Sequence, residues 1–157
     1  MATTTKVQGR RRLRFNSHDD VLAEVRALAA RPTRHLGHWP LPTICQHLAN
    51  AMNLCIDGDV PFKAPLKTRI LARLARSRIL KTGLPTGFKL PAEAEAVLYN
   101  DPGSADAAIA AMEQAVARLQ TTQQRVPHPA LGKMNVHQWN LFHLRHAELH
   151  LSFIVPA

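Results

Sequence analysis

Apolar positions recur every three or four residues in four long stretches of the chain, which is the spacing of an amphipathic helix. The predicted helices cover residues 17–31, 43–57, 104–124 and 135–154. Ser17 and Ser104 are the expected N-caps of the first and third helices. The second helix should stop at Gly58, and the last should open with a capping box formed by Asn135 and Gln138.

Between residues 59 and 103 the pattern is irregular, because prolines and glycines interrupt it repeatedly. We expect one short helix there, over residues 66–80, and a loop or lid over residues 83–91. Residues 1–9 are expected to be a flexible N-terminus, and residues 10–157 a single domain. The predicted fold class is all-α: a four-helix bundle with an irregular insertion, containing a short helix, between the second and third long helices.

The positive charge is uneven along the chain, and this changes the set of expected partners. The formal net charge is +9, and residues 1–89 hold 16 of the 20 lysines and arginines. Such a region attracts anions of any kind, including nucleic acid and small charged substrates. Cys45 and Cys55 fall in one predicted helix, so we expect free thiols, and with no apparent signal peptide or membrane span we expect a cytoplasmic protein.

Histidines on the apolar faces of two predicted helices are the candidate chemistry. On a helical wheel His143 and His150 lie on the same side as His146, together with Trp139 and other large apolar residues. His146 and His150 are four residues apart, the spacing that lets two imidazoles bind one metal ion. His47 lies on the apolar stripe of the second helix, and it is therefore a candidate third ligand.

A single histidine on an apolar helix face is usually a hydrogen-bonded core residue. Three that converge favour a metal ion, because one ion satisfies all three imidazoles and leaves a coordination position open. His143 is open to several roles: a fourth ligand, a hydrogen-bond partner of a ligand, a proton-transfer group, or a replacement for His146. We assign it provisionally to proton transfer or to support of the ligands.

Two stretches resemble the DinB/YfiT-like superfamily of metal-binding four-helix bundles, in a bacterial branch without an established function. They are "GHWPLPTICQHLANAM", similar to that family's Trp followed by an inward His, and "HQWNLFHLRHAELHLSF", similar to its HxxxH. The similarity covers nearly the whole chain, although residues 60–103 depart from the commoner members. The resemblance implies that His47, His146 and His150 bind a divalent metal, zinc or nickel, and that thiol-dependent transfer is one candidate activity.

Three function classes follow. The first is a metal-dependent transferase or hydrolase acting on a small molecule, either a low-molecular-weight thiol or an anionic compound drawn by the basic residues 63–89. The second is a nonspecific nucleic-acid-binding protein, which eight aromatic residues and the lack of a reader motif disfavour. The third is a structural or interaction bundle. Leu141, Leu144 and Leu151, on the back of the last helix, are expected to pack on another helix or in a homodimer.

Overall fold

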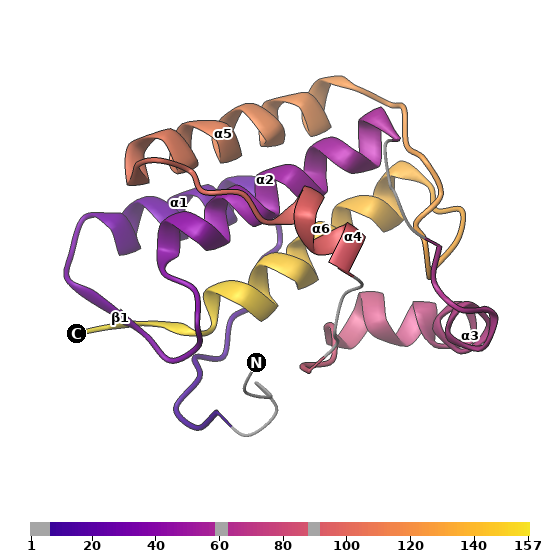
Figure 1. Ribbon diagram of the computed structural model, residues 1–157, viewed down its shortest axis with the longest axis horizontal. Coiled ribbons are helices and arrows are strands. Elements are labelled where there is room, and N and C mark those ends of the chain that lie inside the picture. The colour runs from indigo at the N-terminus through magenta and orange to yellow at the C-terminus, as the bar shows by residue number, and fades with distance from the viewer. Residues whose placement is uncertain (1–6, 59–62, 88–91) are drawn as a thin grey trace.

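The fold is mostly helical, as the sequence predicts. A computed structural model describes residues 7–58, 63–87 and 92–157, and these form six helices and one two-stranded sheet (Figure 1). The elements in chain order are α1 (His18–Ala29), β1 (Thr33–His35), α2 (Leu41–Asp57), α3 (Leu66–Thr82), α4 (Ala92–Leu98), α5 (Ala105–Thr121), α6 (Val136–Leu151) and β2 (Ile154–Pro156). Of the predicted flexible N-terminus, residues 1–6 lie outside the described residues.

The predicted helix ends are confirmed where side-chain chemistry marks them. The Ser17 side chain accepts a hydrogen bond from the backbone of Asp20 and completes a capping box at the start of α1. Ser104 caps α5, and Asn135 opens α6 with the expected capping box. Gly58 closes α2 at φ 90°, a left-handed conformation that glycine adopts without steric cost.

The core lies where α1, α2, α5 and α6 meet. The most extensive helix contact is between α2 and α5, and α6 packs against α1 and α2. Val25, Leu28, Met52, Met112 and Leu151 have no exposed surface in this core. Each such side chain stabilises the fold by roughly 1.5–3 kcal/mol relative to an exposed position.

The small sheet joins two segments far apart in sequence, and the sequence analysis missed it. β1 pairs antiparallel with β2, with Arg34 opposite Val155. The backbone N–H of Leu36 donates to the Phe153 carbonyl over 2.8 Å and extends the pairing. The last helix therefore ends at Leu151, not at residue 154 as predicted. Three-residue strands carry too little alternation to be recognised from a sequence.

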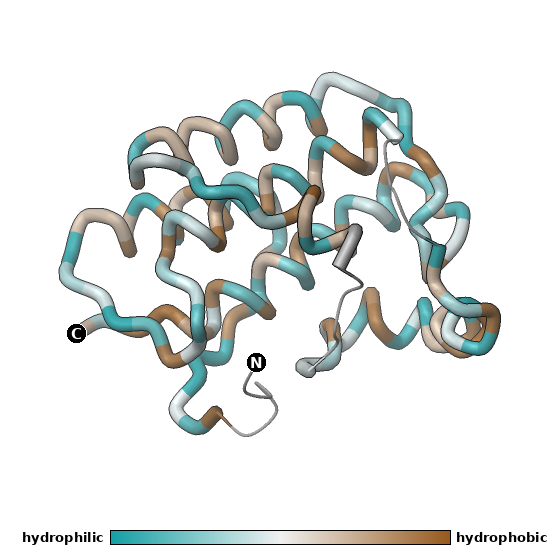
Figure 2. Tube along the Cα trace, in the orientation of Figure 1, coloured by the Kyte–Doolittle hydropathy of each residue, from teal (hydrophilic) through white to brown (hydrophobic). Residues whose placement is uncertain are grey.

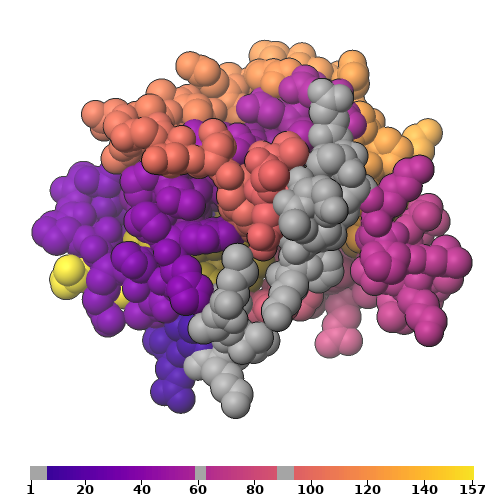
Figure 3. Space-filling model, in the orientation of Figure 1, coloured from indigo at the N-terminus to yellow at the C-terminus, as the bar shows by residue number. Residues whose placement is uncertain are grey.

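The insertion is more helical than predicted. The helix predicted over residues 66–80 is present as α3, but with 17 residues it is as long as α2 and α5 and not short, and α4 was not predicted. The apolar stripe of α3 also faces outward: Leu66, Ile70 and Leu74 are 67%, 51% and 80% exposed. Figure 2 shows that apolar positions recur along α3. In Figure 3 this helix, coloured magenta, lies at the right edge of the molecule.

The back of α6 is covered by this chain itself. Leu144 and Leu151 are buried, and Leu141 is partly buried against the core. The segment before α1 lies along this side, because the Phe15 backbone N–H donates to a Glu148 carboxylate oxygen over 2.7 Å. The apolar strip thus packs within the chain, and the homodimer remains a prediction without this support.

The structure also bears on the two cysteines and on membrane-spanning helices. Cys45 and Cys55 are both free and buried in α2, as predicted. No helix formed by the described residues is long and apolar enough to span a bilayer.

Candidate metal centre

Three histidine side chains from α2 and α6 meet at one point. His47 lies on the buried face of α2, and His146 and His150 lie one turn apart on α6. The Nε2 atom of His146 is 3.0 Å from Nε2 of His47 and 3.0 Å from Nε2 of His150. One ring nitrogen of each residue lies within 4.8 Å of the others, so the cluster could hold a metal ion. These are the three residues predicted from the sequence.

Hydrogen bonding alone cannot satisfy these imidazoles. His47 Nδ1 lies 3.3 Å from the Leu98 carbonyl, so it must carry the proton, and His47 Nε2 is then an acceptor. His146 Nε2 has a single proton at most, yet it faces ring nitrogens on both sides. Among the described residues, His146 Nδ1 is also buried without a hydrogen-bond partner. Three lone pairs directed at one point are, by contrast, what a divalent ion accepts.

Burial keeps the three imidazoles in the neutral form that binds metals. Burial lowers the pKa of His47 to about 4, against a weaker opposite effect of the Leu98 carbonyl. Burial and then the two neighbouring histidines lower the pKa of His146 well below its ordinary value. For His150 the causes are burial, His47 and Arg10. A metal ion would therefore displace few protons near neutral pH.

Aromatic rings and α4 hold the histidines in place. Trp39 stacks on His150 with ring centroids 5.2 Å apart, and Tyr99 stacks on His47 at 4.8 Å. Asn50 donates to the Leu98 carbonyl at the end of α4, the same oxygen that His47 Nδ1 contacts. Tyr99 and α4 were missed in the sequence, where the one available signal was the single tyrosine of the chain close to a short alanine-rich run.

A comparison with known sequence families covers nearly the whole chain. Residues 7–157 match the family described as "Protein of unknown function (DUF1569)". The chain belongs to the DUF1569 family. No curated protein and no solved structure matches it.

His143 of the DUF1569 chain lies outside the three-histidine cluster. Its Nε2 atom is 3.3 Å from the Cys55 Sγ atom, and its ring stacks on Trp139 at a centroid distance of 5.3 Å. It is 1% exposed, and burial, followed by the nearby His18, lowers its pKa well below the ordinary value. In this position His143 is neither a fourth ligand nor a replacement for His146. Its provisional role in proton transfer remains a prediction.

A cavity of about 480 Å³ opens on the cluster, within the size range of small-molecule sites. His47, His146 and His150 line it, as do Trp39 and Tyr99. Residues 84–87 of the predicted lid also line the cavity, while residues 88–91 of that segment lie outside the described residues.

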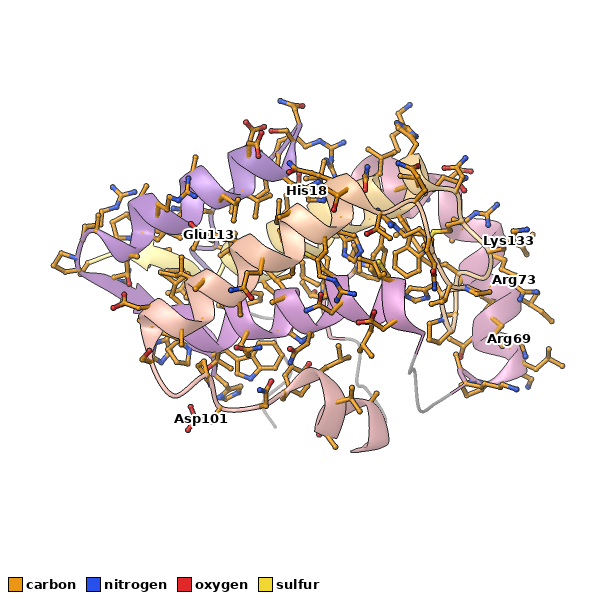
Figure 4. All side chains as sticks on the ribbon, turned by 90° about the horizontal axis from the view of Figure 1, so that it is seen from above. His18, Arg69, Arg73, Asp101, Glu113 and Lys133 are labelled. Carbon is orange, nitrogen blue, oxygen red and sulfur yellow. The ribbon has the colours of Figure 1, made fainter. Side chains whose placement is uncertain are left out.

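The basic residues expected at the mouth are not in the cavity wall. α3 contributes Thr68, Ala72 and Ile79 to the lining, and no lysine or arginine lines it within residues 7–58, 63–87 and 92–157. Figure 4 shows Arg69 and Arg73 at the outer side of the molecule, near Lys133. The DUF1569 chain therefore separates its basic surface from its cavity.

Proposed function

We propose that His47, His146 and His150 hold one divalent metal ion, zinc or nickel, and that the adjoining cavity brings a small-molecule substrate to it. The observation that carries this proposal is the meeting of three Nε2 atoms at 3.0 Å contacts that hydrogen bonding cannot satisfy. Three neutral imidazoles leave a coordination position open, which is typical of reactive metal sites. The reaction class we propose is thiol-dependent transfer or hydrolysis.

We further propose that α1, α2, α5 and α6 make a four-helix bundle of the DinB/YfiT-like kind. The packing of α2 on α5 and of α6 on α1 and α2 supports this arrangement. The order of the ligands supports it too, with one histidine on the second long helix and an HxxxH pair on the last.

When bound, the ion would lower the pKa of a coordinated water or thiol and polarise the substrate. Side chains of this protein would bind the substrate and transfer protons. Burial raises the pKa of Tyr99, so its hydroxyl stays protonated and available as a hydrogen-bond donor to a molecule in the cavity. Cys55 lines the cavity and contacts His143, so a proton carried by His143 would reach the substrate through this thiol.

Metal content tests the proposal. Untagged protein should carry near-stoichiometric zinc or nickel by inductively coupled plasma mass spectrometry, and His47→Ala, His146→Ala and His150→Ala should each lose it. His137→Ala is the matched control, because His137 is exposed on the same helix α6. Wild-type protein that is metal-free and resists reloading would make the three histidines core residues.

Two outcomes would favour the other function classes. Chelator-induced melting with no reaction on any substrate would favour a metal that only stabilises the bundle. Salt-dependent binding of duplex or single-stranded probes in fluorescence anisotropy, unaffected by loss of the metal, would favour nonspecific nucleic-acid binding through the basic surface.

A further inference from the structure

We infer that the molecule taken by this cavity is largely apolar and carries no negative charge apart from the group that contacts the metal. This inference rests on the proposed function and specifies its substrate class. It goes against the expectation of an anionic compound, which came from the basic residues of the sequence. The charges of the side chains that line the cavity, and of those that lie outside it, support this inference.

The cavity wall built by α3 is uncharged although α3 is the most basic helix. Its inner positions carry Thr68, Ala72 and Ile79. Its six basic residues are absent from the lining: Lys67, Arg69, Arg73, Arg76, Arg78 and Lys81. Arg76 donates to the backbone carbonyl of Lys133 over 2.8 Å, and so contributes to packing outside the cavity. One face of α3 therefore lines the cavity, and its charged side chains lie outside the cavity.

Among the described residues, Arg10 is a cation close enough to His150 to lower its pKa, and its Nε and Nη2 groups are already engaged. Its guanidinium donates to the Ser152 hydroxyl over 2.7 Å and to the Leu149 carbonyl over 3.2 Å. It also lies 4.1 Å from the centre of the Phe153 ring. Leu149 and Phe153 line the cavity and Arg10 does not, so an anion there would meet the Phe153 ring and not the guanidinium.

The charge that does line the cavity is negative. Glu95 of α4 is the single carboxylate of the lining formed by the described residues, and it repels an anionic substituent. The remaining wall is mostly aliphatic and aromatic, with Leu54, Leu84 and Trp139 among its members. A bound divalent ion attracts one anionic head such as a thiolate. A second negative charge would lose its hydration without gaining a partner.

Three thiols that share a head and a ring test this inference. They are phenylmethanethiol, 4-(mercaptomethyl)benzoate and 4-(aminomethyl)phenylmethanethiol, which differ only in the charge at the far end of the ring. Each is titrated into protein loaded with cobalt(II), whose absorbance reports coordination by a thiolate. We expect the neutral thiol to bind at least about tenfold more tightly than the benzoate, because the carboxylate must be desolvated. Equal or tighter binding of the benzoate overturns the inference, whereas the amine, which Glu95 attracts, should bind more tightly than the benzoate.

Two lysine variants test whether the lining of the cavity causes the preference for the neutral thiol. Ala72 lines the cavity, whereas its neighbour Leu71 is 66% exposed. Ala72→Lys should tighten binding of the benzoate about tenfold or more, and Leu71→Lys, which adds the same charge outside, should leave it unchanged. Glu95→Gln should shift the preference in the same direction as Ala72→Lys, and it covers the case in which Ala72→Lys misfolds. Equal effects of the two lysine variants would mean that the surface field decides, and the inference would fail.

Failure of the proposed function looks different. Protein that takes up no cobalt contradicts the metal centre, and bound cobalt that responds to none of the thiols contradicts a thiol as the molecule that reaches it. The lining is then tested on metal-free protein with the uncharged apolar dye Nile red, whose fluorescence should rise on binding and fall in Ala72→Lys but not in Leu71→Lys.

Discussion

Helix α6 carries two kinds of histidine, three residues apart: His143 is buried, whereas His146 is partly exposed and lines the cavity. His146 faces the ring nitrogens of His47 and His150 at 3.0 Å. His143 instead faces the sulfur of Cys55 at 3.3 Å and stacks on Trp139. Burial lowers the pKa of both side chains well below the ordinary value. A lowered pKa alone therefore does not distinguish a candidate ligand from a core histidine.

What distinguishes them is the chemistry of the neighbouring atom. The Cys55 thiol donates to the Met52 carbonyl over 3.0 Å, and its sulfur can accept a hydrogen bond from His143 Nε2, so this pair is satisfied without any ion. Burial raises the pKa of the Cys55 thiol to about 11, so this pair is neutral at ordinary pH. Three imidazole nitrogens that face one another have no such arrangement. Among the described residues, the His146 Nδ1 atom has no hydrogen-bond partner, whereas His143 Nε2 has one in Cys55.

The largest expected effect is on zinc affinity. His146→Ala removes one of three ligands, and we expect the dissociation constant for zinc to rise at least about a hundredfold, or about 2.7 kcal/mol. His143→Leu should change it by no more than about threefold, because His143 contacts Cys55 and not the cluster. Competition with a chromophoric chelator measures both constants. Similar losses in the two variants would contradict the division between the two kinds of histidine.

His128, another histidine whose pKa is lowered, extends the comparison through the pH dependence of stability. The backbone N–H groups of Ala130 and Leu131 donate to His128 Nδ1 over 3.0 and 3.1 Å, so this nitrogen must be unprotonated. Burial lowers the pKa of His128 to about 4, against an ordinary value of 6.5. Between these values the unfolded chain binds more protons than the folded chain, so the free energy of unfolding falls as the pH falls below 6.5.

His128→Asn keeps an acceptor for the two N–H groups but does not titrate. In metal-free protein it should remove at most about 2 kcal/mol of the wild-type loss of stability between pH 6.5 and pH 5. Urea unfolding at the two pH values measures the difference. His137→Asn is the control, because His137 is exposed on α6. A pH dependence that is the same in wild type and His128→Asn would show that His128 is not held neutral by the fold.

Much of this arrangement follows from periodicity and side-chain chemistry. The capping residues Ser17, Ser104 and Asn135 act locally, so the sequence predicts the ends that they mark. The inward face of α6 follows from its apolar spacing, which also puts His146 and His150 on one side. His47 and His146 are 99 residues apart in sequence; periodicity made His47 a candidate third ligand, and the resemblance to known bundles supported the same three residues.

The parts that were missed depend on contacts that local sequence does not encode. α4 is seven residues long, too short for a helical period to stand out, and Asn50 of α2 holds its end through Leu98 and Asn100. The outward direction of the α3 leucines was also missed. Leu66, Ile70 and Leu74 are exposed, whereas Thr68, Ala72 and Ile79 line the cavity.

The smallest effect expected is on the stability of metal-free protein, and here the two histidines of α6 should respond in opposite ways. His143→Leu removes a buried contact with the Cys55 sulfur and a stack on Trp139, and it should lower the free energy of unfolding by about 1 kcal/mol. His146→Leu replaces an imidazole whose nitrogens are not satisfied without an ion, so stability should be unchanged or higher.

Urea unfolding in the presence of a chelator compares the two leucine variants with wild type. Because Cys55 is the partner of His143, adding Cys55→Ala to His143→Leu should cost less than Cys55→Ala costs in wild type, and adding it to His146→Leu should cost the same as in wild type. A destabilisation by His146→Leu as large as that by His143→Leu would mean that the cluster stabilises the metal-free fold. His146 would then be as much a core residue as His143, and the case for an ion would rest on metal content alone.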